Sequence, residues 1–277
     1  MSNNHELNPH SRIEIENEMY ERSVSWIMEA GEIIKARMLE KTEYKQKTSH
    51  SDVVTEVDRQ VEAFLVNKIN EYYPEHNIIG EENIGNRASS SPYVWIIDPI
   101  DGTSNFINRK QDFAISVALC EQERGVFGII YDVMAEKFYC ARQGNGAYLN
   151  DRKLSPPEAD GALENELMAI NAPWGSIEEM KRWEHFFRLG PQVRGVRNYG
   201  ATTMELGDMA AGLLGGYVQY YVNSWDYAAG RIILEELGYT FSDLQGRAID
   251  RRYCGGIIAA SPAIHRQIIQ ALQKAAE

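Results

Sequence analysis

Residues 94–106 read VWIIDPIDGTSNF, an apolar run that ends abruptly in Asp-Pro-Ile-Asp-Gly-Thr. The apolar part predicts a buried strand. Pro99 fixes its own φ and biases Asp98 towards an extended conformation, while Gly102 permits a tight turn. We therefore expect Asp98 and Asp101 to lie on one side of the strand end, where two carboxylates suit a divalent cation.

The residues after this turn, Gly102, Thr103 and Ser104, are expected to begin a helix. Unpaired backbone N–H groups and the helix dipole favour an anion at such a position, so a phosphate would bind beside the metal. Taken alone, the stretch is explained equally well as a surface turn that Asp98 caps.

Two further segments place acids next to apolar residues. IIGEEN at 78–83 puts Glu81 and Glu82 after a short apolar strand, and SWDYAAG at 224–230 puts Asp226 near a predicted helix start. In isolation, a solvated loop explains the first segment and a helix N-cap explains the second. If all these acids converge, however, they repel one another, and the site makes sense only with cations bound.

Hydrophobic spacing gives the outline of the fold. Residues 13–38 and 52–73 predict two long amphipathic helices, and β-rich runs between 113 and 149 predict an antiparallel meander. From Leu163 onward the pattern is α/β. The expected strands are 167–170, 217–222 and 256–260, and the expected helices are 177–187, 201–213, 226–237 and a last one after Pro262.

Composition excludes several classes of function. The 277 residues include 40 acidic and 28 basic side chains, a net charge of −12, and no Lys/Arg block that would bind nucleic acid. No segment approaches the roughly 20 apolar residues that span a membrane. Three widely spaced cysteines, Cys120, Cys140 and Cys254, fit a reducing compartment and are expected to be buried. We expect a cytoplasmic protein.

The acidic segments occur in the order typical of the inositol monophosphatase family, within the wider fructose-1,6-bisphosphatase superfamily, and the chain resembles that family from about Tyr20 to its end. WIIDPIDGTSNF at 95–106 and WDYAAGRIILEELG at 225–238 resemble its two signatures, and DVVTEVD at 52–58 also matches. The resemblance implies a layered α-β-α-β-α sandwich in a single domain, 1–277. Its N-terminal α+β half would cover about 11–157 and its C-terminal α/β half about 160–277, and family members are usually homodimers.

The resemblance also implies a metal-ligand set. The residues that match Glu81 and Asp98, with the carbonyl of Ile100, hold one Mg²⁺, and those that match Asp98, Asp101 and Asp226 hold a second. Glu81 also serves a third, weaker ion. All of these ligands are oxygens, which Mg²⁺ prefers, and no His or Cys cluster competes as a zinc site. Ca²⁺ or Mn²⁺ is expected to substitute, and Li⁺ to inhibit.

The implied reaction is hydrolysis of a small phosphate monoester by a metal-activated water. Glu81 and Thr103 would orient the water, and Asp58, after Thr55, would position its partners. Asp101, Gly102 and Thr103 would hold the phosphate. Lys47 resembles the lysine of the family's mobile loop, although a solvated helix connection explains it equally well.

Substrate choice is expected to depend on Gly200, Thr202, Gln219 and Asp226. Gln219 occupies the position where animal inositol monophosphatases carry a glutamate that accepts hydrogen bonds from inositol, and Thr202 occupies a position of a small residue. A neutral amide makes weaker bonds to hydroxyls than a carboxylate does. We therefore predict an enzyme that is not a strict inositol monophosphatase and that tolerates bulkier substrates such as the 2′-phosphate of NADP.

Two alternatives remain open. The metal core does not distinguish this activity from hydrolysis of adenosine 3′,5′-bisphosphate or fructose 1,6-bisphosphate. A non-catalytic role as an accessory factor in RNA metabolism belongs to a different class of function. The complete set of carboxylates and the lack of a basic stripe argue against that role.

Overall fold

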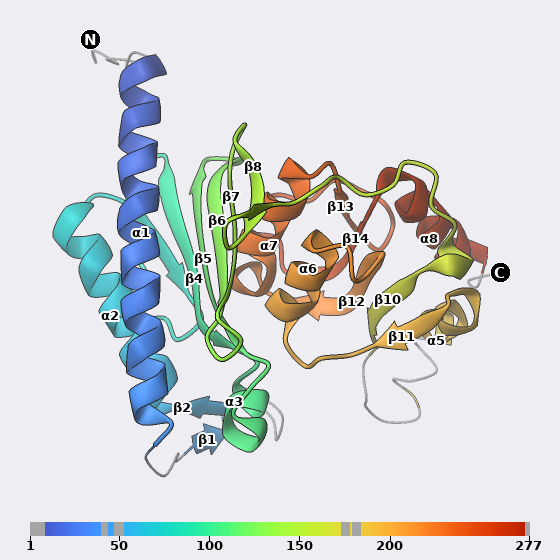
Figure 1. The fold of residues 1–277 in the computed structure, drawn as a ribbon, viewed down its shortest axis with the longest axis horizontal. Helices are drawn as coiled ribbons and strands as arrows, with labels where there is room; N and C mark the ends of the chain where they lie inside the picture. The colour runs from blue at the N-terminus through green and yellow to red at the C-terminus, as the bar shows by residue number, and fades with distance from the viewer. Residues whose placement is uncertain (1–8, 40–43, 47–52, 173–177, 179–183, 275–277) are drawn as a thin grey trace.

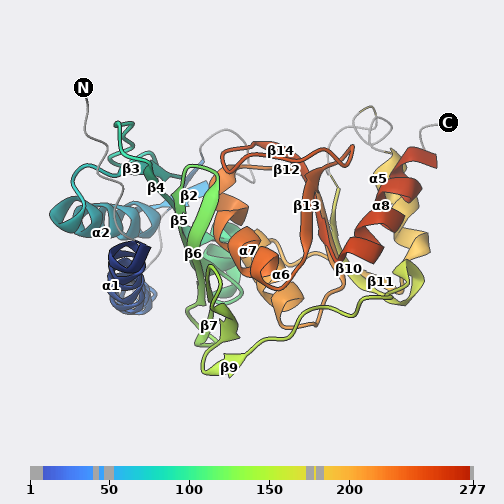
Figure 2. The ribbon, with the colours of Figure 1, turned by 90° about the horizontal axis from the view of Figure 1, so that it is seen from above.

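The computed structural model describes residues 9–39, 44–46, 53–172, 178 and 184–274. Two large β-sheets alternate with three layers of helices (Figures 1 and 2). The predicted α-β-α-β-α sandwich is therefore confirmed. The outer helices on one side are α1 (Pro9–Arg37) and α2 (Glu56–Tyr72), the central ones are α6 (Thr202–Ala210) and α7 (Ser224–Glu236), and those on the other side are α5 (Glu184–Leu189) and α8 (Pro262–Lys274).

The first sheet has seven strands in the order β3-β4-β5-β6-β7-β8-β9. Its first pair, β3 and β4, is parallel, and the remaining neighbours are antiparallel, which includes the meander predicted for residues 113–149. The strands are β3 (Asn77–Gly80), β4 (Tyr93–Asp101), β5 (Ala114–Glu121), β6 (Arg124–Asp132), β7 (Lys137–Arg142), β8 (Gly146–Leu149) and β9 (Arg152–Lys153).

The second sheet has five strands in the order β11-β10-β12-β14-β13. Its middle strand, β12, runs parallel to β10 and antiparallel to β14. The strands are β10 (Leu167–Asn171), β11 (Gly195–Arg197), β12 (Gly216–Val222), β13 (Thr240–Asp243) and β14 (Gly255–Ala260). Sequence periodicity did not predict β11 and β13, because both are short edge strands.

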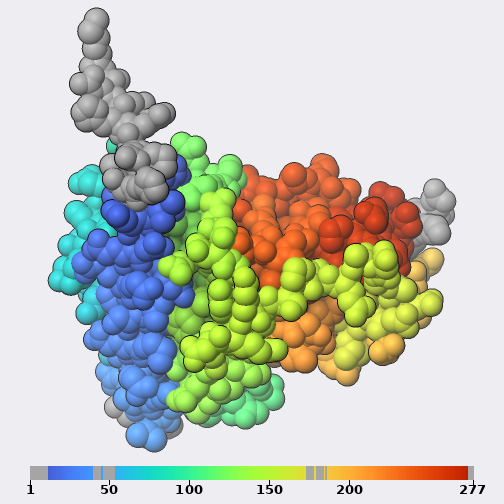
Figure 3. Space-filling model, turned by 45° about the horizontal axis from the view of Figure 1, so that its top comes forward, coloured from blue at the N-terminus to red at the C-terminus, as the bar shows by residue number. Residues whose placement is uncertain are grey.

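The central helices join the two sheets. One buried cluster contains Ile96 of the first sheet, Ile257 of the second and Leu206 and Tyr227 of the helices between them. The first sheet and the central helices adjoin directly on the face shown in Figure 3. The two sheets thus share a buried core through the central helices, and a single domain over residues 1–277 stays a prediction.

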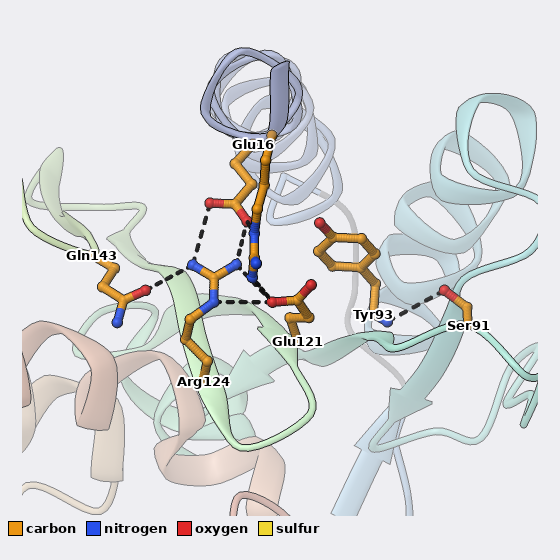
Figure 4. Close-up of polar contacts among 7 residues, drawn as sticks. Glu16, Ser91, Tyr93, Glu121, Arg124 and Gln143 are labelled. Atoms are coloured by element: carbon orange, nitrogen blue, oxygen red, sulfur yellow. Dashed lines mark hydrogen bonds and ion pairs between the residues drawn. The ribbon is translucent and has the colours of Figure 1, made fainter. Parts of the chain in front are cut away.

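Hydrogen bonds and ion pairs of Arg124 link α1 to the first sheet (Figure 4). Arg124, at the start of β6, donates to Glu121 of β5 at 3.1 Å and to Gln143 at 2.7 Å, and it pairs with Glu16 of α1. Because its guanidinium is planar and carries five donors, it can satisfy several acceptors at once. The outer helix layer is thus held by charge as well as by apolar packing.

Two expectations from the sequence were wrong. The second helix begins at Glu56 and not at Asp52, because Val53–Thr55 forms strand β2, which pairs with β1 (Tyr44–Gln46). Thr55 then caps α2, its Oγ1 accepting from the N–H of Val57 at 3.1 Å. Cys254 is exposed, whereas Cys120 and Cys140 are buried as expected. In the described part of the chain, no helix is both long and apolar enough to cross a bilayer.

Gly102 links β4 to α3 (Thr103–Arg109) with a φ of +90°. A Cβ at this position would lie 2.9 Å from Ala201 Cβ and 3.2 Å from the Asp112 carbonyl oxygen. The turn therefore requires glycine for two reasons, the left-handed backbone and the close approach of α6.

We expect Gly102→Ala to lower the free energy of unfolding by about 2–5 kcal/mol, adding a left-handed penalty of about 1–2 kcal/mol to an overpacking cost of about 1–3 kcal/mol. Gly212→Ala is the matched control, since Gly212 has a φ of +78° and nothing within 4 Å of its Cβ position. Urea denaturation of both variants separates the two costs. Equal losses in the two variants would contradict the packing argument.

Candidate active site

A β-bulge in β4 brings Asp98 and Asp101 to one side. In the pairing with β5, Asp98 lies opposite Ser116 and Asp101 opposite Ala114, so three steps on β4 match two on β5. In a regular strand, residues three apart point to opposite faces, and the extra residue of a bulge reverses this. Pro99 fits the bulge because it has no N–H to donate to the sheet.

Helix α6 holds the side chain of one of these acids, Asp101. Its Oδ2 accepts hydrogen bonds from the backbone N–H of Thr203 at 2.6 Å and from the Thr203 hydroxyl at 2.5 Å. Thr203 is fully buried in the first turn of α6. Sequence analysis missed this residue, which lies 102 positions from its partner.

Asp226 lies in the first turn of α7, where its Oδ2 accepts from the backbone N–H of Asn223 at 2.7 Å. The preceding strand, β12, has a register shift between Gln219 and Val222. The N-cap of α7 is therefore Asn223 and not Asp226, which lies at the third helical position, completes the capping box and also belongs to the acidic cluster described next.

The four predicted metal-binding carboxylates influence one another electrostatically. Glu81 follows β3, and its N–H donates to the Ile97 carbonyl at 3.2 Å, which places it beside the end of β4. Burial, then repulsion from Glu81, Asp101 and Asp226, raises the pKa of Asp98 well above its usual range. Burial also raises the pKa of Asp101 to about 6, against the opposing effect of the Thr203 hydrogen bonds. A cation would relieve this repulsion.

The donor set fits Mg²⁺. Glu81, Asp98, Asp101 and Asp226 offer hard oxygen donors, and the carbonyl of Ile100 lies between the two β4 acids. Among the residues that the structure describes, no three acidic, histidine or cysteine side chains form a ready-made metal cage. Mg²⁺ does not require such a cage, because it commonly binds one or two carboxylates and completes its shell with water and substrate phosphate.

Asp58 and Thr103 meet beside this cluster. The Thr103 hydroxyl lies 3.1 Å from Asp58 Oδ1 and 3.2 Å from the carbonyl oxygen of Ile100. Asp58 is fully buried, and its Oδ2 also accepts from the N–H of Thr55 at 2.9 Å. Burial raises the pKa of Asp58 to about 6. An ionised Asp58 accepts a hydrogen bond from the Thr103 hydroxyl, which leaves the lone pairs of Thr103 Oγ1 to accept from a water or a hydroxyl group.

Comparison with known proteins identifies the family. The model of the inositol monophosphatase family matches residues 16–277. The chain belongs to the inositol monophosphatase family. It is 38% identical over 256 residues to the inositol-1-monophosphatase of Bacillus subtilis, covering 91% of this chain and 96% of the relative. It is also 31% identical over 228 residues to the Nus factor SuhB of Salmonella typhimurium, covering 82% and 84%.

Two solved structures have the same fold. SaIMPase-II with 2′AMP bound superposes with a TM-score of 0.81 at 32% identity, covering 92% of this chain and 95% of that one. An IMPase/NADP phosphatase complexed with Mg²⁺ and phosphate superposes with a TM-score of 0.83 at 25% identity, covering 93% and 95%. The family acts on phosphate monoesters, so this protein is a phosphatase.

The residues of this inositol monophosphatase family member that are predicted to contact the substrate lie at the start of α6, on β12 and, for Asp226, on α7. Gln219 Nε2 donates to the Tyr221 carbonyl at 3.0 Å, while its Oε1 is buried without a partner. Thr202 Oγ1 hydrogen-bonds the Tyr217 hydroxyl at 2.9 Å. Gly200 has a φ of +73° and precedes α6. Lys47 lies outside the described residues.

Two residues that sequence analysis missed lie beside Gln219. Asn171 is the in-register neighbour of Gln219 on β10, and its Oδ1 is likewise buried without a partner. Its Nδ2 donates to Glu205 at 2.6 Å. Glu205 is buried, which raises its pKa to about 7 despite hydrogen bonds from Asn171 and the Tyr199 N–H. No sequence motif marks either residue, since the pairing depends on strand register.

We expect Mg²⁺ to raise the melting temperature more at pH 7.5 than at pH 5. Protons compete with the metal for Asp98 and Asp101, and metal ligands must be deprotonated. The pKa of Asp101 is raised from 3.8 to about 6 in the folded state, so its contribution to stability is present at low pH and is lost as pH rises through about 6. Bound Mg²⁺ restores stability there, by about 2.7 kcal/mol at a hundredfold excess over Kd.

The measurement is a thermal melt at each pH in EDTA and in MgCl₂ at constant ionic strength. At each pH, the melting temperature in EDTA is subtracted from that in MgCl₂. This subtraction removes the effect of histidines that titrate elsewhere in the protein. A melting temperature that does not respond to Mg²⁺, or a response equal at both pH values, would contradict this expectation.

Proposed function

We propose that this phosphatase uses Mg²⁺, held by Glu81, Asp98, the Ile100 carbonyl, Asp101 and Asp226, to hydrolyse small phosphate monoesters. The observation that carries the proposal is that Glu81, just after β3, Asp101 of β4 and Asp226 of α7 all lie close enough to Asp98 to raise its pKa. Burying several acids that repel one another is unfavourable unless a cation binds them, because each unpaired buried charge raises the free energy of the folded state. Ca²⁺ or Mn²⁺ would substitute for Mg²⁺, and Li⁺ would inhibit.

The residues around the acids have separable roles in this proposal. Bound Mg²⁺ supplies the charge that activates water and stabilises the phosphoryl oxygens. Thr103, polarised by Asp58, accepts a hydrogen bond from the attacking water and so orients it, and Glu81 orients the same water from the β3 side. The backbone N–H groups of Gly102 and Thr103 would donate to the phosphate, and Asp101 would lie beside it. Lys47 would approach the phosphate from its own loop.

Specificity is proposed to be broader than for inositol phosphate alone. Gln219 brings a neutral carbonyl oxygen, not a carboxylate, to the predicted leaving-group side, and Asp226, Gly200 and Thr202 complete that wall. Among relatives with solved structures, one has 2′AMP bound and another is described as an NADP phosphatase. Both fit a substrate such as NADP 2′-phosphate. We further propose a cytoplasmic homodimer.

An accessory role in RNA metabolism is the alternative of another class, because one relative is a Nus factor. The net charge of −12 disfavours direct RNA binding by the chain. Co-purification of RNA at moderate salt would favour that role, whereas turnover of phosphate esters with Mg²⁺ favours catalysis. Comparing rates on adenosine 3′,5′-bisphosphate, fructose 1,6-bisphosphate, inositol 1-phosphate and NADP distinguishes the enzymatic alternatives.

We expect Asp101→Asn and Asp226→Asn to lower kcat by at least about 10²-fold in saturating Mg²⁺, the scale on which transition-state charge stabilisation is lost. Asp208→Asn, on α6 beside Tyr139, is the charge-matched control and should retain activity. Steady-state kinetics on one phosphate ester, with a melt to confirm folding, is the measurement. Near-normal kcat in both site variants would refute the metal-site assignment.

We expect Gln219→Glu to raise kcat/KM for inositol 1-phosphate by about tenfold and to lower it for NADP, because a carboxylate binds hydroxyls more strongly and repels a second phosphate. Gln270→Glu, exposed on α8, adds the same charge away from the site. If kcat/KM for both substrates stays unchanged in Gln219→Glu, this residue does not determine substrate choice.

A further inference from the structure

The loop that carries Glu81 is held by a buried carboxylate outside the predicted ligand set. Glu62 of α2 is fully buried, and its two oxygens accept from two backbone N–H groups of this loop. Oε2 accepts from Glu82 at 2.8 Å, and Oε1 accepts from Ile84 at 2.7 Å. We call residues 81–87 the Glu81 loop.

These bonds fix the backbone on both sides of Glu81. The N–H of Glu81 donates to the Ile97 carbonyl and so holds the peptide before it. The N–H of Glu82 donates to Glu62 and so holds the peptide after it. With both peptide planes fixed, the Cα–Cβ direction of Glu81 is fixed relative to Asp98, the next residue along β4 after Ile97.

Close packing and a second side chain reinforce this arrangement. A Cβ at Gly80 would lie 2.5 Å from Glu62 Oε1, so the carboxylate lies directly against the glycine backbone. On the loop's other side, Asn86 Oδ1 accepts from the Gly80 N–H at 2.8 Å, and its Nδ2 donates to Asn83 at 2.8 Å. Asn83 and Gly85 both have positive φ, a conformation that Asn and Gly adopt at low cost, so the loop can turn sharply at these two positions.

A buried carboxylate at Glu62 destabilises the folded state more than a neutral side chain would. Burial, opposed by the two backbone hydrogen bonds, raises the pKa of Glu62 to about 7, and repulsion from Glu82 and Glu81 adds to the rise. A buried acid next to other acids destabilises the metal-free protein. This unfavourable placement of Glu62 is explained if cation binding requires the position that Glu62 imposes on Glu81.

We propose that Glu62 is a positioning residue that holds the Glu81 loop in its metal-binding conformation and thereby sets the affinity of the site for Mg²⁺, with Asn86 as its counterpart on the other side of the loop. The inference rests on the proposed metal role of Glu81. Residues that orient metal ligands without touching the metal commonly change its affinity by 10- to 100-fold.

The decisive variant is Glu62→Asp, which keeps the charge but shortens the side chain so that it no longer reaches both N–H groups. Glu71→Asp, exposed near the end of the same helix, is the matched control. Melting temperatures are measured in EDTA and across a MgCl₂ titration. We expect the Mg²⁺ midpoint to rise about tenfold in Glu62→Asp and to stay unchanged in Glu71→Asp, with kcat in saturating Mg²⁺ within about threefold of the wild type.

A lower melting temperature in EDTA with an unchanged Mg²⁺ midpoint would show that Glu62 only stabilises the fold, and would overturn the inference. Asn86→Ala, at an exposed residue, carries the same test if Glu62→Asp does not fold: a raised midpoint supports the inference and an unchanged one overturns it. A wild-type protein that binds Mg²⁺ but hydrolyses no phosphate ester refutes the proposed function alone. A wild-type protein with no Mg²⁺ response refutes both.

Discussion

The repulsion among carboxylates gathered at the end of β4 is the constraint on which the rest of the site depends. Inside a protein such charges interact far more strongly than in water, and each needs donors or a cation. The fold supplies backbone donors to the three aspartates in turn. Ile100 donates to Asp98, Thr203 to Asp101 and Asn223 to Asp226. Two of these donors begin helices α6 and α7, whose positive ends face the acids and partly offset their charge before any metal binds.

Small departures from regular strand geometry deliver the acids to one place. The bulge of β4 turns Asp98 and Asp101 to the same side, and the register shift of β12 comes just before the turn into α7 and Asp226. The parallel pairing of β3 with β4 brings Glu81 to the same end of the sheet, since parallel strands end on the same side. A more regular sheet would scatter these side chains over two faces.

The parts of this site that could be predicted from the sequence are those built from residues close together in the chain. The Asp-Pro-Ile-Asp-Gly-Thr turn predicted two acids on one side of a strand end, because the conformational rules of Pro and Gly act locally. Glu81 and Asp226 entered the predicted ligand set through the family resemblance. Thr203, Glu62 and Asn171 were missed, because each acts on a partner at least 20 positions away and belongs to an ordinary helix or strand. The start of α2 was misplaced for the same reason, since β2 exists only by pairing with β1.

The metal side and the substrate side of the site draw on different parts of the fold. Most of the proposed metal donors come from the first sheet, whereas Gln219, Asn171 and Glu205, on the proposed substrate side, come from the second sheet and α6. Gln219 and Asn171 are neighbours in register, and each keeps a buried carbonyl oxygen without a donor, a state that costs about 1–3 kcal/mol per group. A leaving group that brings hydrogen-bond donors recovers this free energy, and one that brings only acceptors does not. On the proposed assignment, substitutions on β10 and β12 change which phosphate ester is preferred without moving Asp98 or Asp101. Asn171 meets Gln219 only through strand register, so this part of the substrate side could not be predicted from a local motif.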